Sequence, residues 1–262
     1  MRTLTCFVLL LLAGGGLFAQ KEKANGTNSL QYSEFIPVEP IEFYDNVEVA
    51  DNEGNVDVKY IKSMNKRELL EYLTNETVLV SVAEVDPAGK MSFIPGRVSN
   101  KGMQYIVTMD YLKFATLEVK KEGDVAGEAA AGVGFRVILN ISSRAKDINL
   151  SDIFSIGMAA TDKKVYGSVR VEAIGLHDPE ITSVIPLPSE ISGASIQSVM
   201  QAITIIKYKI YDEKTRLNPQ IVGVRGTKEG VTLQELREAV MKYHKLGKKN
   251  VSTNKSAPQP KK

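Results

Sequence analysis

The side chains best suited to chemistry stand close together in the segment 176–180, as His177, Asp178 and Glu180. An imidazole titrates near neutral pH, and a carboxylate beside it can orient it, so such a group can act as a general base or bind a metal ion. The chain has one other histidine, His244, and neither accompanies an HExxH or GxSxG motif. A surface turn is therefore the favoured interpretation, and His177, Asp178 and Glu180 remain the catalytic candidates.

The sequence gives weaker support to two other kinds of site, a pair of catalytic carboxylates and a nucleotide-binding loop. Glycoside hydrolysis needs only two carboxylates facing each other across a cleft, and with 31 acidic residues in the chain a carboxylate-dependent hydrolase is an alternative function. The glycine- and alanine-rich segment 123–134 lacks a GxGxxG or Walker motif and precedes a predicted strand instead of following one. We therefore expect a flexible or closely packed loop there, and we predict no nucleotide, metal or other cofactor.

Residues 1–20 have the pattern of a cleaved signal peptide. Arg2 gives a basic start, 7–12 is a short apolar run, and small residues precede Gln20. This ending resembles the signal peptides of exported bacterial proteins, with cleavage by signal peptidase I after Ala19 or Gln20. Cys6 precedes the apolar run, which argues against lipidation. Removal of this segment takes away the only cysteine, so no disulfide or thiolate site is expected in the mature chain. We predict a periplasmic or cell-envelope location.

The other end of the chain is basic, although the net charge of the whole is only +2. The tail 248–262 has almost no apolar residues and no acidic ones, so we expect it to be disordered. It could contact an anionic surface such as phospholipid; nucleic acid is not expected as the partner of an exported protein. The lysines concerned are Lys248, Lys249, Lys255, Lys261 and Lys262.

The elements that must position these residues are strands and amphipathic helices. Segments 133–141 and 165–173 alternate apolar and polar residues, which predicts two strands of one sheet, parallel or antiparallel. One face would meet the core, and the other would expose Arg136, Asn140, Arg170 and Glu172. Between them, 149–160 predicts a helix capped by Asn149 or Ser151, with Ile153, Phe154, Met158 and Ala160 able to pack.

The remaining segments predict further elements. An extended leader, 21–45, could form an edge strand, because its prolines oppose a helix. A hairpin is expected over 47–60, helices over 65–74 and from 195 to 210, and strands over 78–85 and 221–224. Segments 103–109 and 112–119 are two strands, or one strand with a bulge near Asp110. A capping box at Thr232 and Glu235 begins a last helix that ends near Gly247.

Together these patterns predict an α+β protein with a mostly antiparallel sheet and two to three packed helices, after a cleaved signal peptide. Residues 46–247 would form a single globular domain, with a candidate sub-boundary near 123–132. The leading hypothesis is an exported, non-enzymatic protein that binds an envelope protein or a small ligand. The alternatives are the carboxylate-dependent periplasmic hydrolase and a peripheral membrane protein held by the lysine-rich tail.

Overall fold

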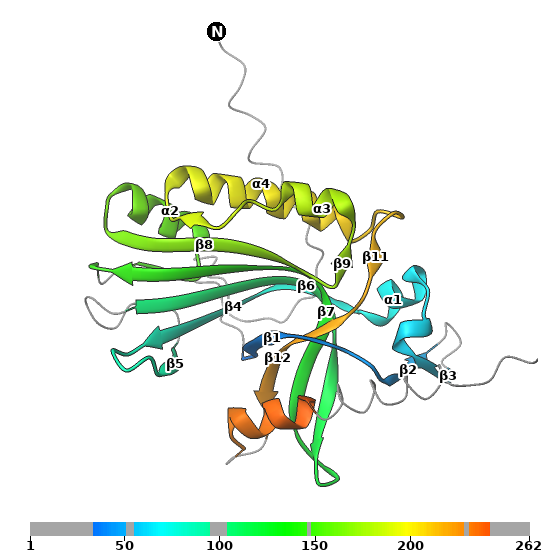
Figure 1. The fold of residues 1–262 in the computed structure, drawn as a ribbon. Coiled ribbons are helices and arrows are strands. Elements are labelled where there is room, and N and C mark those ends of the chain that lie inside the picture. The colour runs from blue at the N-terminus through cyan, green and yellow to red at the C-terminus, as the bar shows by residue number, and fades with distance from the viewer. Residues whose placement is uncertain (1–33, 51–54, 95–103, 146–147, 228–230, 242–262) are drawn as a thin grey trace, which may run out of the picture.

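The computed structural model describes residues 34–50, 55–94, 104–145, 148–227 and 231–241. It has an α+β fold, in which several helices pack on a large antiparallel sheet (Figure 1). The predicted signal peptide, 1–20, and the predicted basic tail, 248–262, lie outside the described residues.

The main sheet is built around a long hairpin of two strands, β6 (Gln104–Lys121) and β7 (Asp124–Ser143). The strand order is β1-β12-β7-β6-β4-β5, with every neighbouring pair antiparallel. The other strands on this path are β1 (Ile36–Glu42), β12 (Gln220–Gly226), β4 (Asn75–Val85) and β5 (Met91–Ile94). The extended segment before residue 45 thus contributes an edge strand, as the prolines predict.

One edge of β7 serves two partners in succession. Its first half, Gly127 to Gly132, pairs with β12, and its second half, Gly134 to Ser143, pairs with β8 (Val165–Ile174). The other edge pairs with β6 throughout. The two predicted strands 133–141 and 165–173 are therefore direct antiparallel neighbours. A two-residue strand, β10 (Ser189–Glu190), lies on the far edge of β8.

Three helices lie along one side of the sheet: α2 (Ile153–Thr161), α3 (Pro179–Val184) and α4 (Gly193–Lys209) (Figure 1). The remaining elements are a hairpin of β2 (Asn46–Ala50) and β3 (Val56–Tyr60), the 3-10 turn η1 (Ile61–Ser63), and α1 (Lys66–Tyr72). A short ladder joins β9 (Leu176–His177) to β11 (Arg216–Leu217). A last helix is described over 233–241.

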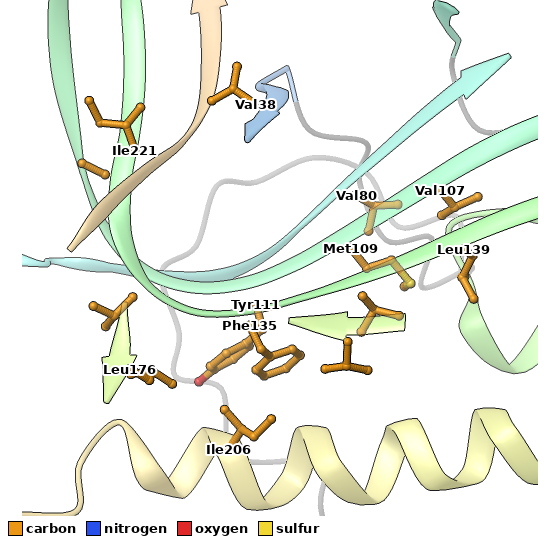
Figure 2. Packing of buried hydrophobic residues seen from close by; sticks show 14 of the residues in the cluster. Val38, Val80, Val107, Met109, Tyr111, Phe135, Leu139, Leu176, Ile206 and Ile221 are labelled. Carbon is orange, nitrogen blue, oxygen red and sulfur yellow. The ribbon is translucent and has the colours of Figure 1, made fainter. Parts of the chain in front are cut away.

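The main core lies between the sheet and α4. Tyr111 of β6 stacks on Phe135 of β7, with ring centroids 5.2 Å apart and planes 13° from parallel. Ile206 of α4 is directed toward this pair (Figure 2). The predicted apolar stripe of α4 is confirmed, because Ile196, Val199, Ile206 and Ile210 are all buried. Ser192 caps the helix with a capping box.

The prediction that Arg136 faces solvent is wrong. Its side chain lies on the sheet face opposite α4 and is buried, because β1 and β12 cover that face. Its Nε and Nη2 atoms donate to the two carboxylate oxygens of Asp110, both at 2.7 Å. Nη1 donates to the Val38 carbonyl at 2.7 Å, and Nη2 also donates to the Val222 carbonyl at 2.8 Å. Both carbonyls lie where the β1–β12 and β12–β7 registers shift, so Arg136 occupies two irregularities of the ladder.

The prediction of a loop over the glycine- and alanine-rich segment is wrong. Nearly all of this segment forms the first half of β7. Small side chains suit it because neighbouring backbone is very close. A Cβ atom at Gly132 would lie 2.3 Å from the carbonyl oxygen of Lys113 and 2.6 Å from the Cβ of Phe114. Such a distance is well inside van der Waals contact, so the absence of a side chain is what allows β6 and β7 to pair here.

Two further local predictions need correction. There is no bulge near Asp110, because Asp110 is held in register opposite Arg136. The β6–β7 register shifts instead between Val119 and Lys120. Helix α2 is capped by Asp152, whose side chain accepts from the Phe154 N–H at 3.0 Å. Phe154 and Met158 do not pack inward but are 61% and 65% exposed. Ile153, Ile156, Gly157 and Ala159 supply the buried face of this helix.

Other local predictions are confirmed. Asn65 caps α1 in a capping box with Glu68, the β2–β3 hairpin forms, and 78–85 lies within an interior strand. Thr232 and Glu235 form the second capping box, with the Glu235 N–H donating to the Thr232 hydroxyl at 3.3 Å. The predicted end of this helix near Gly247 lies outside the described residues.

Candidate functional site

The structure separates His177 from the two acidic residues that follow it. His177 ends β9, and Asp178 caps α3 by accepting from the Glu180 N–H at 2.8 Å. Pro179 stands in the first turn of α3, where its fixed φ favours a helix start. Consecutive residues of an extended segment point to opposite sides, so the imidazole and the Asp178 carboxylate face different surroundings.

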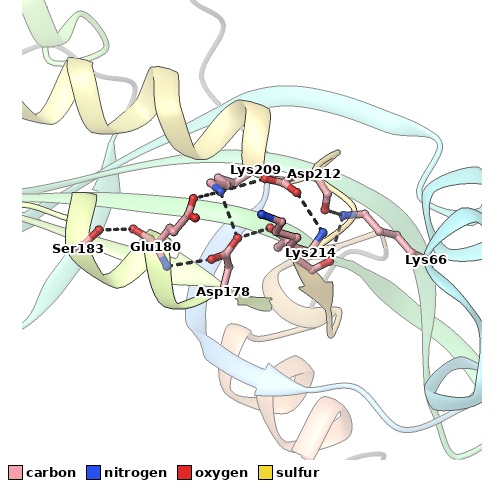
Figure 3. Close-up of polar contacts among 8 residues, drawn as sticks. Lys66, Asp178, Glu180, Ser183, Lys209, Asp212 and Lys214 are labelled. Carbon is pink, nitrogen blue, oxygen red and sulfur yellow. Dashed lines mark hydrogen bonds and ion pairs between the residues drawn. The ribbon is translucent and has the colours of Figure 1, made fainter.

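Asp178 and Glu180 belong to a charged cluster at the carboxyl end of α4 (Figure 3). The Lys209 ammonium lies 3.4 Å from Asp178 Oδ2 and 2.9 Å from Asp212 Oδ2, and it also pairs with Glu180. Thr215 donates its hydroxyl to Asp178 at 2.8 Å. These contacts join α3, α4 and the turn before β11. Both candidate acids are therefore engaged with a lysine.

The contacts of this cluster shift the pKa values of its members in the directions that stabilise charge. The pKa of Asp178 is lowered, first by the Glu180 backbone N–H and then by the Thr215 hydroxyl. The pKa of Asp212 is lowered mainly by its hydrogen bond from Lys209. Hydrogen bonds to Glu180 and Asp212 raise the pKa of Lys209. All of these groups are thus held in their charged forms at neutral pH.

His177 instead lines a pocket of about 300 Å³ between β9, β11, η1 and α1. Its other polar lining residues are Lys62, Arg216 and Asn218, and buried apolar residues, among them Ile61, Leu69 and Leu217, form its floor. Arg216 is the direct cross-strand partner of His177. Among the described lining residues there is no aspartate or glutamate.

Lys62 has unusual surroundings for a cation. Its ammonium donates to the Asn218 side-chain oxygen and lies 4.5 Å from the centroid of the Tyr44 ring. Burial lowers the pKa of Lys62, and the charge of Glu42 opposes that shift. No carboxylate forms an ion pair with Lys62 in the part of the chain that the structure describes. Its charge is therefore only partly compensated.

A second, larger pocket of about 400 Å³ lies against the hairpin β6–β7 and the helix 233–241. Asp45, Glu48 and Glu118 contribute carboxylates to its lining, together with Tyr72 and Val240. Burial, with a smaller contribution from the Asp45 charge, raises the pKa of Tyr72 to about 12. These acids were not singled out by sequence, because Glu118 lies about seventy residues from Asp45 and Glu48 in the chain.

A polar cluster lies under the end of α4. The Glu76 carboxylate of β4 accepts from the hydroxyls of Tyr111 and Tyr211. Burial and this hydrogen bond raise the pKa of Tyr211 to about 12 and that of Tyr111 further in the same direction. Both tyrosines thus stay protonated at physiological pH, and they tie the end of α4 to the sheet.

Two further searches of the described residues concern metal-binding clusters and membrane-spanning helices. Within residues 34–241, masked segments excepted, no group of three histidine, cysteine or acidic side chains is placed to hold a metal ion. Across the same ranges, no helix combines the length and apolar character needed to cross a bilayer. The tail lysines Lys248, Lys249, Lys255, Lys261 and Lys262 lie outside the described residues.

Comparison with known proteins gives no family for this chain. No protein-family model matches it, and neither the curated proteins nor the solved structures contain a match.

Sequence reasoning identified His177 but missed Lys62 and Arg216. No local motif marks these two residues. Arg216 reaches the pocket through the pairing of β11 with β9, and Lys62 comes from η1, far earlier in the chain. Each of those strands has two residues, which is too short to give a periodic signal.

Proposed function

We propose that this chain is an exported, non-enzymatic binding protein of the bacterial cell envelope, and that the His177 pocket is its ligand site. The observation that supports a ligand site is the combination of an apolar floor with polar side chains that internal carboxylates do not occupy. Ligand pockets usually combine an apolar lining with a few convergent polar groups. The signal-peptide pattern of residues 1–20 supports export.

The pocket can be tested without knowing the ligand. The chain has two histidines and eight methionines, so imidazole and methyl signals can be assigned individually by NMR. A fragment library with neutral, anionic and cationic members is titrated into the mature protein. We expect a subset to shift the ring signals of His177 and the methyl signal of Met64, which both line the pocket, and to leave unchanged the methyl signal of Met158, which does not line it. If no library member, whatever its charge, shifts the ring signals of His177, the proposal is wrong.

A second candidate function, a carboxylate-dependent hydrolase, is supported by Asp45 and Glu118 in the larger pocket. The test is release of 4-nitrophenol from a panel of 4-nitrophenyl glycosides. A hydrolase would lose at least about a hundredfold in turnover in both Glu118→Gln and Asp45→Asn, since removing a general acid or base costs that much. Glu122→Gln, in the hairpin turn, is the control. Activity that survives both substitutions, or is absent from the wild type on the whole panel, argues against this function.

A further inference from the structure

We propose that the ligand of the His177 pocket is a small organic anion, with a carboxylate or phosphate head and a compact apolar tail. This inference rests on the proposed function, because it assigns a chemical class to the ligand of the same site. It follows from three independent features of the pocket: the charge of its lining, the placement of that charge and the apolar floor.

The first feature is a cation, Lys62, that has no ion-pair partner among the described residues and that feels the charge of Glu42 only at longer range. Its surroundings differ from those of Lys209 and Lys66 at the same end of the molecule. Lys209 pairs with three carboxylates, and Lys66 donates to the backbone carbonyls of Asp212 and Thr215. Among the described residues, Lys62 contacts the amide oxygen of Asn218 and the Tyr44 ring, and no carboxylate is paired with it. A partly buried ammonium is stabilised by an anion more than by a neutral acceptor, so Lys62 favours an anionic ligand.

The second feature is the cross-strand pair of Arg216 and His177. Residues directly opposite in an antiparallel ladder have Cβ atoms about 4.5–5.5 Å apart and share one face. Both side chains line the pocket and can donate hydrogen bonds into it. The guanidinium fork matches the geometry of a carboxylate or phosphate.

The third feature sets the rest of the ligand. Ile61, Met64, Leu69 and Leu217 line the same pocket as the basic groups, and all four are buried. Burying an apolar tail against them is favourable in proportion to the area removed from water. The volume of about 300 Å³ is at the lower end of the range for ligand pockets. The ligand is therefore small, with its charge at one end.

The test uses six probes that vary head and tail separately. Hexanoate and hexyl phosphate have both an anionic head and an apolar tail. 1-Hexanol and hexylammonium have the same tail with a neutral or cationic head. Acetate and inorganic phosphate have the anionic head without the hexyl tail. Each is titrated into the mature protein at fixed pH and ionic strength, following the imidazole signals of His177 with His244 as the internal reference. We expect saturable shifts of His177 with one or both hexyl anions, at least about tenfold tighter than with any other probe. The stronger of the two identifies the head group.

Substitutions then test the assigned side chains. Arg216→Ala removes an exposed side chain, and Lys62→Gln keeps a hydrogen-bond donor without the charge. Each substitution should lower the affinity for the tighter-binding hexyl anion about tenfold, as expected for the loss of a charge-assisted hydrogen bond. Lys214→Ala, an exposed lysine two residues from Arg216, should leave the affinity unchanged. Circular dichroism shows whether each variant is folded.

The outcomes separate the two proposals. If 1-hexanol or hexylammonium binds as tightly as the hexyl anions, the anion assignment is wrong while the pocket remains a ligand site. The same holds if Arg216→Ala and Lys62→Gln bind the hexyl anions as the wild type does. If no probe and no member of the mixed-charge library moves His177, both proposals fail.

Discussion

Individual charged side chains in this protein differ mainly in what compensates them. Arg136 and Asp110 compensate each other in the interior, Lys209 is compensated by three acids, and Lys62 is left with a neutral acceptor. The first two arrangements contribute to the fold. Because the third does not complete an internal pair, it is the one from which we infer a ligand.

The buried pair can be tested by removing one member. Arg136→Met leaves the Asp110 carboxylate buried without a partner, which should cost about 3–5 kcal/mol of unfolding free energy. Burial already raises the pKa of Asp110, so the variant carboxyl should take up a proton at mildly acidic pH and part of the loss should disappear. Urea denaturation at pH 7.5 and pH 5 measures both effects.

The double variant Asp110→Leu/Arg136→Met is the control for an unpaired charge. It should be more stable than Arg136→Met but less stable than wild type, because the carbonyls of Val38 and Val222 still lose their donor. A double variant no more stable than the single one would show that the unpaired carboxylate is not the cause of the loss.

The Lys209 cluster makes stability depend on pH in a defined direction. The lowered pKa values of Asp178 and Asp212 contribute stability above about pH 4, the unfolded value, and this is lost as pH falls through the folded values. The raised pKa of Lys209 contributes below about pH 10 and is lost as pH rises through the folded value. The melting temperature of Lys209→Met should therefore lie furthest below that of wild type from about pH 5 to pH 9. The difference should shrink toward pH 2.

Lys90→Met, on an exposed lysine between β4 and β5 and away from the cluster, is the matched comparison. Its melting temperature should stay close to that of wild type over the whole range. If the difference in melting temperature between wild type and Lys209→Met is the same at pH 2 and pH 7, the alkyl chain of Lys209, and not its charge, supplies the stabilisation.

Side-chain alternation predicted strands well but could not show what covers each face. Arg136 has the period of an outward residue, yet β1 and β12 cover it, and they lie far away in the sequence. The reverse error concerns Phe154 and Met158, whose apolar character suggested packing and which are exposed. For the site, sequence analysis grouped His177 with Asp178 and Glu180, and the structure separates His177 from both acids. The neighbours of His177 depended on pairing that no local pattern encodes.

Among the elements, β7 determines the layout because it pairs with three strands. Composition concealed it: the first half consists of glycine and alanine with few β-branched residues, which lowers strand propensity. Close packing between β6 and β12 overrides that propensity. The helices were easier to predict, because the caps of α1 and the apolar stripe of α4 are both local signals.

Gly132 gives a direct test of this packing. In Gly132→Ala the new methyl group would meet the Lys113 carbonyl and Phe114, so β6 and β7 must separate locally. Overpacking of this kind should cost about 1–3 kcal/mol of unfolding free energy, measured by urea denaturation. Gly226→Ala, in β12, is the control: its methyl group would lie 3.8 Å from the nearest atom, a Leu236 methyl carbon. It should change stability by less than about 0.5 kcal/mol. Equal effects of the two would contradict the steric explanation.

For the whole molecule, export is the property that sequence predicts and that experiment can test directly. A bacterial host expressing residues 1–262 should yield a periplasmic protein beginning at Gln20 or Lys21, since cleavage is expected after Ala19 or Gln20. Intact mass spectrometry of fractionated cells measures this. A chain that lacks residues 2–20 should stay in the cytoplasm. Recovery of the uncleaved chain from the cytoplasm would overturn the export prediction.

The pairing of β1 with β12 has a consequence for how the chain folds. Ile36 lies opposite Val224, so this edge of the sheet cannot close until two segments far apart in the chain have met. The hairpin β6–β7 needs only local contacts and can form earlier. In the interval the partly folded chain presents Phe114, Leu112 and the Asp110–Arg136 pair without their cover. That surface is where we expect a chaperone to hold the partly folded protein.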